Sequence, residues 1–421
     1  MQFLLKIYVT HHYYWMYLLI IIFLLVIILS RWTFKLFSHE YFVLNLLSKM
    51  KHSNIKFVHG DKIIFSVINM NGKKVATVNI FDRYKFFKNL YKHGEAGLGK
   101  SYTKKYWDTD DLLECLTVFA LNEQYIVVPN MLRFNTSDHK VSDDYKKIKH
   151  HYDVGNDFYD KILLDDLSAY SCGFWRNSND TLNNAQFRKV DTIIQKINPK
   201  PGSTILDIGC GWAKIANYVA RQTECKVDGV TLSDEQMKYG NKNSTKDVNV
   251  FKMHYTQLNK KYDHIYSIGM FEHVRYENYD QFFECIHKLL KPNGRFLLHT
   301  IIDIRPKDPQ YIDKSFISQY IFPGGQVPNS DWVISHLEKN ELVLIHAEIY
   351  GGQHYARTLH EWNKNMQKSK AWIYANYGEA LFRQYEYYFN ICEAGFTTGK
   401  LALGHYLITN TMQTSLDNNY L

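Results

Sequence analysis

The stretch Thr204-Ile-Leu-Asp-Ile-Gly-Cys-Gly-Trp-Ala-Lys214 decides the fold class of this chain. Its apolar first half is typical of a short buried strand, and Gly209 and Gly211 follow that strand at once. Glycine permits the tight turn that lets a backbone approach a ligand at a helix N-terminus. A dinucleotide-binding fingerprint would have a small residue where Lys214 stands. The stretch therefore favours a nucleoside cofactor without a pyrophosphate, and an ordinary glycine-rich turn is the alternative.

Short apolar strands and helical intervals alternate around this stretch. Strands are expected at residues 204–208, 227–232, 248–253, 264–268 and 296–300, followed by a strand at 342–349 and an aromatic-rich helical segment at 361–392. Such alternation is typical of a doubly wound parallel sheet. We therefore expect an α/β, Rossmann-like domain.

The end of the second strand predicts the character of the cofactor contact. It reads Val230-Thr-Leu-Ser-Asp-Glu-Gln236. Thr231 and Gln236 can form hydrogen bonds without charge, whereas the acidic pair suits the first turn of a helix. A neutral contact next to a D-x-G-x-G strand end fits S-adenosylmethionine. The residues expected to contact it from these two strand ends are Asp207, Gly209, Gly211, Thr231, Leu232 and Gln236.

A small α+β domain is expected over residues 36–145. Two strand-like runs, 62–68 and 74–80, flank Asn71-Gly72, which is a strong hairpin signal. Helical spacing follows at residues 84–91 and 110–121, and the polar stretch 137–150 marks the domain boundary.

One segment of this region matches a phosphate-binding loop letter for letter. Gly94-Glu-Ala-Gly-Leu-Gly-Lys-Ser101 has the pattern G-x-x-x-x-G-K-[ST]. A true phosphate loop follows a buried strand, whereas a charged helix precedes this segment. We therefore expect a turn between helices and no nucleotide hydrolysis.

The N-terminal residues 1–35 predict a transmembrane anchor. No Lys, Arg, Asp or Glu occurs from Ile7 to Ser30, which is long enough to cross a hydrocarbon core of roughly 30 Å. A cleaved signal peptide is the alternative, but its apolar region is usually only about 7–15 residues long. The lysines and arginines that follow outnumber those that precede the segment, which predicts a single-pass membrane protein with a cytoplasmic catalytic body.

The composition of the chain excludes several classes of protein and of binding partner. The chain has 421 residues, a net charge of +8 and 46% hydrophobic residues, which excludes a disordered protein. The basic excess is too diffuse for nucleic acid and favours an anionic surface such as a phospholipid leaflet. Six scattered cysteines without a C-x-x-C pair predict free thiols and no metal site.

Six short motifs carry a family resemblance. They are His151-Tyr-Asp-Val-Gly-Asn-Asp-Phe158, Tyr170-Ser-Cys-Gly-Phe-Trp175, Leu206-Asp-Ile-Gly-Cys-Gly-Trp212, Val230-Thr-Leu-Ser233, Gly269-Met-Phe-Glu-His-Val274 and Leu298-His-Thr-Ile301. Together they resemble the cyclopropane-fatty-acyl-phospholipid synthase family of S-adenosylmethionine-dependent methyltransferases, over roughly residues 80–405. The resemblance implies a methyltransferase domain at 146–421 and a lipid-engaging role for the small domain.

The resemblance also implies the roles of individual residues. Tyr170, Ser171, Gly209, Thr231 and Gln236 correspond to S-adenosylmethionine contacts. The pocket for a bicarbonate ion corresponds to Cys172, Glu272, His299, Tyr355 and, through its backbone, Ile301. Hydrogen-bond donors would hold the anion while the carboxylate accepts its hydroxyl. Taken one at a time, each of these residues could instead be an ordinary buried side chain.

Two residues depart from the family pattern. Ala213 stands where the family more often has glycine, and it is expected to place one methyl near the methionine portion of the cofactor. His254 stands where an aspartate commonly contacts the adenine amine, and only a neutral histidine could accept a hydrogen bond there.

The implied reaction transfers a methylene unit from S-adenosylmethionine to the cis double bond of unsaturated phospholipid acyl chains, with bicarbonate as general base. A lipid C-methyltransferase or an amine N-methyltransferase is the alternative within the same class. A non-catalytic, membrane-tethered lipid-binding protein is the alternative of another class. The expected partner is a membrane phospholipid, and a homodimer is compatible with the sequence.

Overall fold

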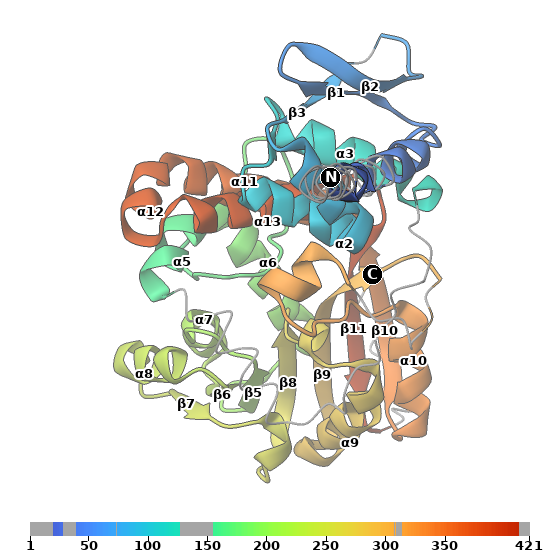
Figure 1. The fold of residues 1–421 in the computed structure, drawn as a ribbon. Coiled ribbons are helices and arrows are strands. Elements are labelled where there is room, and N and C mark those ends of the chain that lie inside the picture. The colour runs from blue at the N-terminus through green and yellow to red at the C-terminus, as the bar shows by residue number, and fades with distance from the viewer. Residues whose placement is uncertain are drawn as a thin grey trace, which may run out of the picture.

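Two β-sheets organise the chain in the computed structural model, which describes residues 20–27, 39–72, 74–126, 155–306, 308 and 314–411. Within these residues the larger sheet has the strand order β10-β11-β9-β8-β5-β6-β7 and the smaller sheet has the order β2-β1-β3-β4. Figure 1 shows the smaller sheet above, the larger sheet below and helices α11–α13 between them.

Five strands of the larger sheet run parallel to one another. They are β5 (Thr204–Ile208), β6 (Lys226–Thr231), β7 (Val248–Lys252), β8 (Tyr262–Ile268) and β9 (Leu290–Asp303), which confirms the five predicted strands. The chain passes outward from β5 to β6 and β7 and then returns to place β8 on the other side of β5. The strand order therefore reverses between β5 and β8, which is where open α/β sheets bind ligands.

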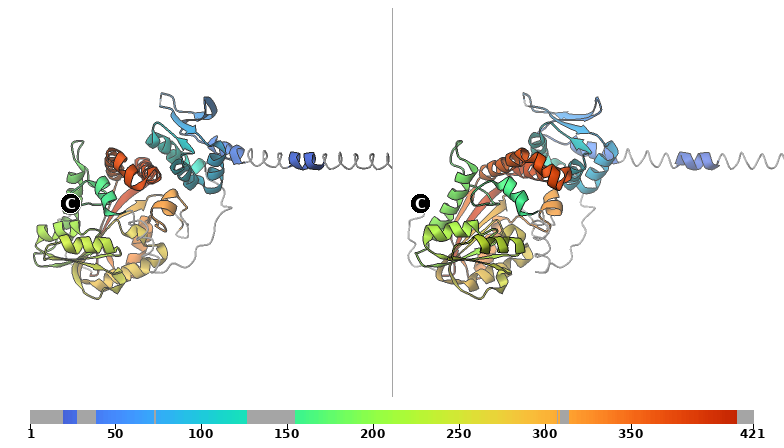
Figure 2. Two further views of the ribbon diagram at one scale, coloured as in Figure 1. Left: turned by 60° about the vertical axis from the view of Figure 1, so that its left-hand side comes forward. Right: turned by 90° about the vertical axis from the view of Figure 1, so that its left-hand side faces the viewer.

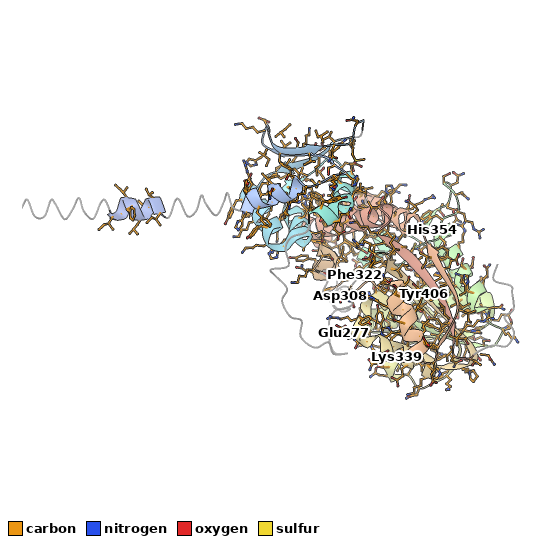
Figure 3. The ribbon with its side chains drawn as sticks, turned by 90° about the vertical axis from the view of Figure 1, so that its right-hand side faces the viewer. Glu277, Asp308, Phe322, Lys339, His354 and Tyr406 are labelled. Carbon is orange, nitrogen blue, oxygen red and sulfur yellow. The ribbon has the colours of Figure 1, made fainter. Side chains whose placement is uncertain are left out.

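The far edge of this sheet is antiparallel. The predicted strand at 342–349 is β10 (Val343–Tyr350), but β11 (Leu401–Thr409) was not predicted. β11 lies between β9 and β10 and is antiparallel to both, so the sheet is mixed and not purely parallel. Because eight of the nine β11 residues are buried, the strand has no polar alternation to reveal it. Its Tyr406, labelled in Figure 3, shares a hydrogen bond of 2.7 Å with Ser330 Oγ.

Helices cover both faces of the larger sheet. On one face α6 (Leu182–Ile197), α7 (Lys214–Thr223) and α8 (Asp234–Asn243) pack, and on the other α9 (Tyr279–Leu289) and α10 (Ser330–Lys339) pack. Side chains along each strand alternate between these faces. Ile205, for example, joins the core under α6, whereas Leu206 joins the core under α9.

Four helices form the layer between the sheets. They are α5 (Asn156–Leu163), α11 (Gln353–Lys368), α12 (Lys370–Tyr377) and α13 (Glu379–Thr397), which confirms the helical segment expected at 361–392. One buried cluster runs from the small sheet through α2 and α3 to α11 and α13. The small sheet therefore shares its core with the C-terminal helices. The boundary predicted near residue 145 lies outside the described residues, so the division into domains stays a prediction.

The small sheet corrects the predicted hairpin. Its strands are β1 (Asn54–His59), β2 (Lys62–Ile68), β3 (Ala76–Ile80) and β4 (Trp107–Asp108). β2 pairs with β1 across Gly60, and β3 pairs in parallel with β1 instead of forming a hairpin with β2. The residues around Asn71-Gly72 turn, but they connect strands that are not neighbours. Strand pairing is a non-local choice that a turn signal alone does not determine.

The segment that matches a phosphate loop is mostly helical. It lies in α2 (Arg83–Thr103), whose only non-helical residue is Gly94, with φ 54° and ψ −126°. Gly94 kinks the helix, so the expected break between helices is a single residue. Gly97 and Gly99 are buried where a Cβ would meet the backbone of Asn89 or the ring of Phe316. Both glycines therefore permit close packing of α2 against its neighbours. The next helix, α3 (Leu112–Asn122), is capped by the side chain of Asp111.

The predicted anchor falls mostly outside the described residues. Residues 20–27 are helical and expose large apolar side chains. Figure 2 shows this short helix in blue. Within the described ranges, no helix has both the length and the apolar character needed to cross a membrane.

Candidate functional site

A pocket opens at the carboxyl ends of β5, β6 and β8, at the point where the strand order reverses. Its walls are the turns after these strands, the segment 167–171, and the loop at 323–325. All eight residues predicted to contact the cofactor line this one pocket: Tyr170, Ser171, Asp207, Gly209, Gly211, Thr231, Leu232 and Gln236. Residues that lie up to 66 positions apart in sequence are thus brought to one cavity.

The turn after β5 is built from residues with left-handed backbone angles. Gly209 has φ 88°, Gly211 has φ 52° and Ala213 has φ 60°. Ala213 is 1% exposed and its methyl packs in the core beneath α7, not against the pocket. The expectation that this methyl lies near the methionine portion is therefore wrong. Family glycine at this position is instead explained by the backbone, because only glycine adopts this region without cost.

The end of β6 forms a neutral hydrogen-bonded corner. Thr231 Oγ1 donates to Gln236 Oε1 at 2.6 Å. Ser233 caps α8 by accepting from the backbone of Gln236. Both Thr231 and Gln236 are at least nine-tenths buried, so the corner is held without charge. Their contact with the cofactor stays a prediction.

A buried carboxylate lies at the base of the pocket. Asp207 is 3% exposed, and burial raises its pKa to about 7 against the opposing effects of Tyr266 and Lys189. Lys189 is completely buried and donates to Ser171 Oγ and Gln186 Oε1, both at 2.7 Å. Burial lowers the pKa of Lys189 to about 8, while Asp165 opposes this shift. The sequence did not predict a role for Lys189, because a lysine in a helix is usually exposed to solvent.

His254 lines the pocket beside Tyr255. Burial lowers its pKa to about 4, so the ring is neutral at physiological pH. The Thr256 hydroxyl lies 2.7 Å from Nδ1, and the backbone N–H of Thr256 donates to the same nitrogen at 3.4 Å. A neutral ring that accepts at Nδ1 carries its proton on Nε2. His254 is thus neutral, as a contact with the adenine amine would require. Its acceptor nitrogen, Nδ1, is however used to cap the turn Tyr255–Gln257.

The residues predicted to bind an anion lie next to this pocket, and the structure joins some of them directly. The Ile301 amide donates to Glu272 Oε1 at 2.7 Å, so it serves the carboxylate and not a ligand here. Glu272 Oε2 is buried and has no partner among the described residues. Burial raises the pKa of Glu272 to about 7, against the backbone hydrogen bond from Ile301.

His299, Cys172 and Tyr355 lie around one aromatic ring. Phe174 stacks on His299, with centroids 6.1 Å apart, and packs in one cluster with Cys172 and Tyr355. His299 Nε2 is a second buried atom without a partner among the described residues. Cys172 is completely buried, which raises the pKa of its thiol. The thiol is therefore a neutral donor.

Known proteins are similar to this chain over the region that holds the pocket and the predicted anion site. The family model described as mycolic acid cyclopropane synthetase matches residues 139–406. The cyclopropane-fatty-acyl-phospholipid synthase of Escherichia coli strain K12 is 33% identical over 360 residues, which cover 83% of this chain and 92% of the relative. The chain belongs to the mycolic acid cyclopropane synthetase family. The family resemblance of the six motifs is thereby confirmed.

Solved structures agree with this cyclopropane synthetase membership. The mycolic acid cyclopropane synthase CmaA1 complexed with SAH and CTAB has a TM-score of 0.59 and 30% identity, covering 63% of this chain and 98% of that one. Coclaurine N-methyltransferase bound to N-methylheliamine and SAH has a TM-score of 0.59 and 19% identity, covering 74% and 98%, and shares the fold. The protein is an S-adenosylmethionine-dependent methyltransferase.

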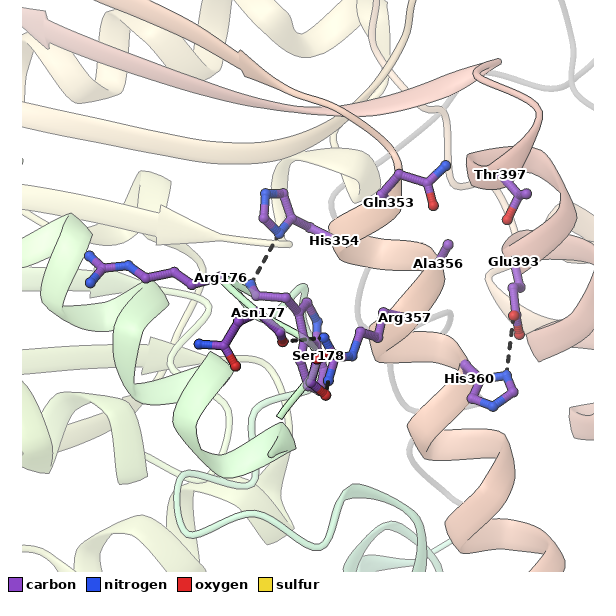
Figure 4. A pocket seen from close by; sticks show the side chains of 11 residues that line it. Arg176, Asn177, Ser178, Gln353, His354, Ala356, Arg357, His360, Glu393 and Thr397 are labelled. Atoms are coloured by element: carbon purple, nitrogen blue, oxygen red, sulfur yellow. Dashed lines mark hydrogen bonds and ion pairs between the residues drawn. The ribbon is translucent and has the colours of Figure 1, made fainter. Parts of the chain in front are cut away.

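A second groove of this cyclopropane synthetase family member lies outside the predicted site (Figure 4). Loop residues 175–178 form one wall, and α11 and α13 form the other. Arg357 lies 4.0 Å over the ring of Trp175 and donates to the carbonyls of Asn177, Ser178 and Asp180. These contacts fasten the loop after the Tyr170–Trp175 motif to α11, the helix that carries Tyr355.

Proposed function

We propose that the protein transfers a methylene unit from S-adenosylmethionine to the cis double bond of unsaturated phospholipid acyl chains and thereby forms cyclopropane fatty acids. One observation carries the proposal. The cofactor pocket and a buried polar cluster are adjacent along two short segments, Ser171–Cys172 and Gly269–Glu272. A methyl donor and a proton acceptor can therefore meet the same bond of a substrate.

We further propose that bicarbonate binds between Glu272 and His299. The fit rests on two buried polar atoms, Glu272 Oε2 and His299 Nε2, which have no partner among the described residues. Buried polar groups without partners are costly, so a small polar ion at this place would be stabilised. The buried ammonium of Lys189 acts on both His299 and Cys172, which favours an anion over a cation.

The two small molecules supply the reacting groups. When bound, S-adenosylmethionine provides the methyl group, and bicarbonate accepts the proton that this methyl loses as the ring closes. The protein residues orient and shield them. Lys189 fixes Ser171 in the cofactor pocket, and Glu272 is held by the Ile301 amide. A carboxylate with a pKa raised to about 7 can hold a shared proton with the anion at neutral pH.

Aromatic side chains pack around Tyr170, which lines the cofactor pocket, and we propose that the acyl chain lies against them. Tyr170 packs 5.1 Å from Trp362 and 6.3 Å from Phe322, and its hydroxyl donates to Tyr388 at 3.2 Å. Tyr355 stacks on Phe396 at 4.5 Å. Such a wall accommodates an apolar chain, excludes water and stabilises positive charge through the ring faces.

The substrate class and product separate this proposal from its alternatives. The E. coli relative is named for fatty-acyl phospholipids and CmaA1 for mycolic acids, and both names specify cyclopropane formation. The amine N-methyltransferases among the compared structures are 14–19% identical to this chain, which shows a shared fold and no shared activity. Ring closure removes a proton from the new methyl group, whereas amine methylation removes none from it, so an acceptor held beside that group supports ring formation.

Membrane attachment is also a proposal. The uncharged run from Ile7 to Ser30 supports a single-pass anchor with the catalytic body in the cytoplasm, and the net charge of +8 supports attraction to anionic leaflets. The small sheet with α2 and α3 would engage the lipid surface. A homodimer stays a prediction.

The direct experiment uses purified full-length protein, labelled S-adenosylmethionine and vesicles of either monounsaturated or fully saturated phospholipid. Label is expected in the lipid only with unsaturated chains. Proton NMR of the product should show the upfield resonances of ring methylene protons. Exocyclic methylene protons or the doublet of a branch methyl group, in place of the ring signals, would overturn ring formation. Label in a head-group amine would establish the N-methyltransferase alternative.

A further inference from the structure

Three polar side chains form a row across the antiparallel edge of the large sheet. The pairing of β9 with β11 places His299 opposite His405, and the pairing of β11 with β10 places His405 opposite Glu348. These three strands lie side by side in Figure 1. Nδ1 of His299 is 2.8 Å from Nε2 of His405, and the two residues are 1% and 0% exposed. The row leads from the proposed anion site toward the sheet edge.

Lys196 of α6 completes this row. Its ammonium lies 2.6 Å from Glu348 Oε2, 3.0 Å from the Tyr350 hydroxyl and 3.0 Å from His405 Nδ1. Tyr350 itself donates to Glu348 at 2.6 Å, so the Tyr350 oxygen accepts from Lys196. The three N–H groups of the ammonium therefore have three acceptors.

The charge of Lys196 determines the direction of every hydrogen bond in the row. An ammonium group donates and cannot accept, so His405 Nδ1 must accept from it. A neutral imidazole that accepts at one nitrogen carries its proton on the other. His405 therefore donates from Nε2 to His299 Nδ1. By the same rule His299 carries its proton on Nε2, the atom without a partner among the described residues.

The surroundings of His299 and His405 keep both imidazole rings neutral. Burial lowers the pKa of His299, and the ammonium groups of Lys189 and Lys196 lower it further. Burial lowers the pKa of His405 in the same way, reinforced by His299, Lys196, Lys189 and His346. Burial also lowers the pKa of Lys196, but its hydrogen bond to Glu348 opposes this shift and holds the ammonium form.

We propose that Lys196 and His405 are positioning residues that fix His299 in the Nε2–H tautomer, so that His299 presents a hydrogen-bond donor to the anion of the methyl-transfer reaction. The assignment of an anion rests on the proposed function, whereas the tautomer follows from the row itself. Without Lys196 the two rings could reverse their hydrogen bond and turn a lone pair toward the anion. A pair of histidines with a merely structural role would tolerate either direction.

Two variants of His405 distinguish an effect of hydrogen-bond direction from an effect of side-chain packing. His405→Gln retains one acceptor and one donor, and so can accept from Lys196 and donate to His299, whereas His405→Leu fills similar space with neither. We expect His405→Leu to lower kcat about 10- to 100-fold, the range for outer partners that orient a functional histidine. We expect His405→Gln to remain within about threefold of the wild type. The affinity for S-adenosylmethionine should be unchanged in both, because His405 does not line the cofactor pocket.

The tautomer is measured without reference to activity. Full-length protein with ¹⁵N-labelled histidine is compared by solid-state NMR with His299→Gln, which identifies the His299 signals by their loss. We expect a protonated Nε2 and a bare Nδ1 in the wild type and in His405→Gln, and a mixture of tautomers in Lys196→Met. A protonated Nδ1 in the wild type would overturn the proposal, as would equal activity of His405→Leu and the wild type or equal loss in both His405 variants. A wild type that is inert on unsaturated vesicles but has the expected tautomer would overturn the proposed function alone.

Discussion

The carboxylate of Glu272 accepts a hydrogen bond of 2.7 Å from the backbone amide of Ile301. This bond ties the short 3₁₀ turn after β8, Phe271–His273, to the C-terminal end of β9. The second oxygen of Glu272 is buried and, like His299 Nε2, has no partner among the residues described. Glu272 is thus held in place by the sheet and available for chemistry.

Replacing this carboxylate should impair turnover and spare cofactor binding. Glu272→Gln keeps the volume but replaces an acceptor with a mixed donor and acceptor, so the anion would be misoriented. We expect turnover to fall by about 10²-fold or more, the usual scale for positioned acid–base groups. Steady-state rates on unsaturated vesicles and calorimetric binding of S-adenosylmethionine measure the two effects. Wild-type turnover of the variant in bicarbonate-stripped buffer would refute the role of Glu272.

The raised pKa of Glu272 predicts a pH-dependent stability. The folded protein holds this proton up to about pH 7, whereas the unfolded chain releases it near the ordinary pKa of glutamate. The folded state binds more protons between these values, so stability falls as pH rises, by about 1.4 kcal/mol per unit for this one group. Glu272→Gln should therefore lose less stability than the wild type from about pH 5 to about pH 8 in ligand-free denaturant titrations. Asp207 and Asp165 also have raised pKa values and contribute equally to both proteins, so parallel pH profiles would contradict the burial of the Glu272 charge.

Two alanine–glycine exchanges test which part of the β5 turn touches the cofactor. Ala213→Gly should leave the Kd for S-adenosylmethionine within about twofold, because the lost methyl lies in the core. Relief of the left-handed strain, on the order of 1 kcal/mol, offsets the lost burial. Gly211→Ala is the matched control, since its φ of 52° resembles the 60° of Ala213 but its new methyl would enter the pocket. Gly211→Ala should weaken binding; a larger loss in Ala213→Gly would reverse the assignment.

Removal of residues 1–35 tests the proposed anchor. None of the motifs or pocket residues lies in this segment, so the truncated protein should fold and bind S-adenosylmethionine. Its activity on anionic vesicles should depend more steeply on salt, because only electrostatic attraction would remain. Sedimentation with membranes and salt titration of activity measure this. Unchanged sedimentation after truncation would show that another surface holds the protein to the membrane.

Lys100 tests the absence of a phosphate loop. It lies inside the helix α2, whereas a phosphate loop connects a strand to the start of a helix. Lys100→Ala should leave S-adenosylmethionine binding intact and lower vesicle activity only mildly, since one lysine near an anionic surface contributes on the order of 1 kcal/mol. Equilibrium dialysis should detect no saturable ATP binding to either form. Binding that disappears in the variant would mean that the segment is a nucleotide site after all.

The sequence by itself predicted those parts of the fold that depend on residues close together in the chain. Five parallel strands and the turn after Asp207 follow from alternating apolar runs and from glycine, because strand formation and tight turns depend on nearby residues. The six motifs identified the family for a related reason, since their residue types and order are properties of the sequence itself.

The tertiary structure alone decided which distant segments meet. It paired β1 with β2 and β3, where the Asn71-Gly72 signal predicted another hairpin, and it inserted β11 between β9 and β10. It also turned Ala213 into the core and buried Lys189 under Ser171. His405 lies 106 residues from His299, and only sheet register brings the two rings together. Strand pairing and burial depend on the free energy of the whole packed core, and no window of the sequence contains that information.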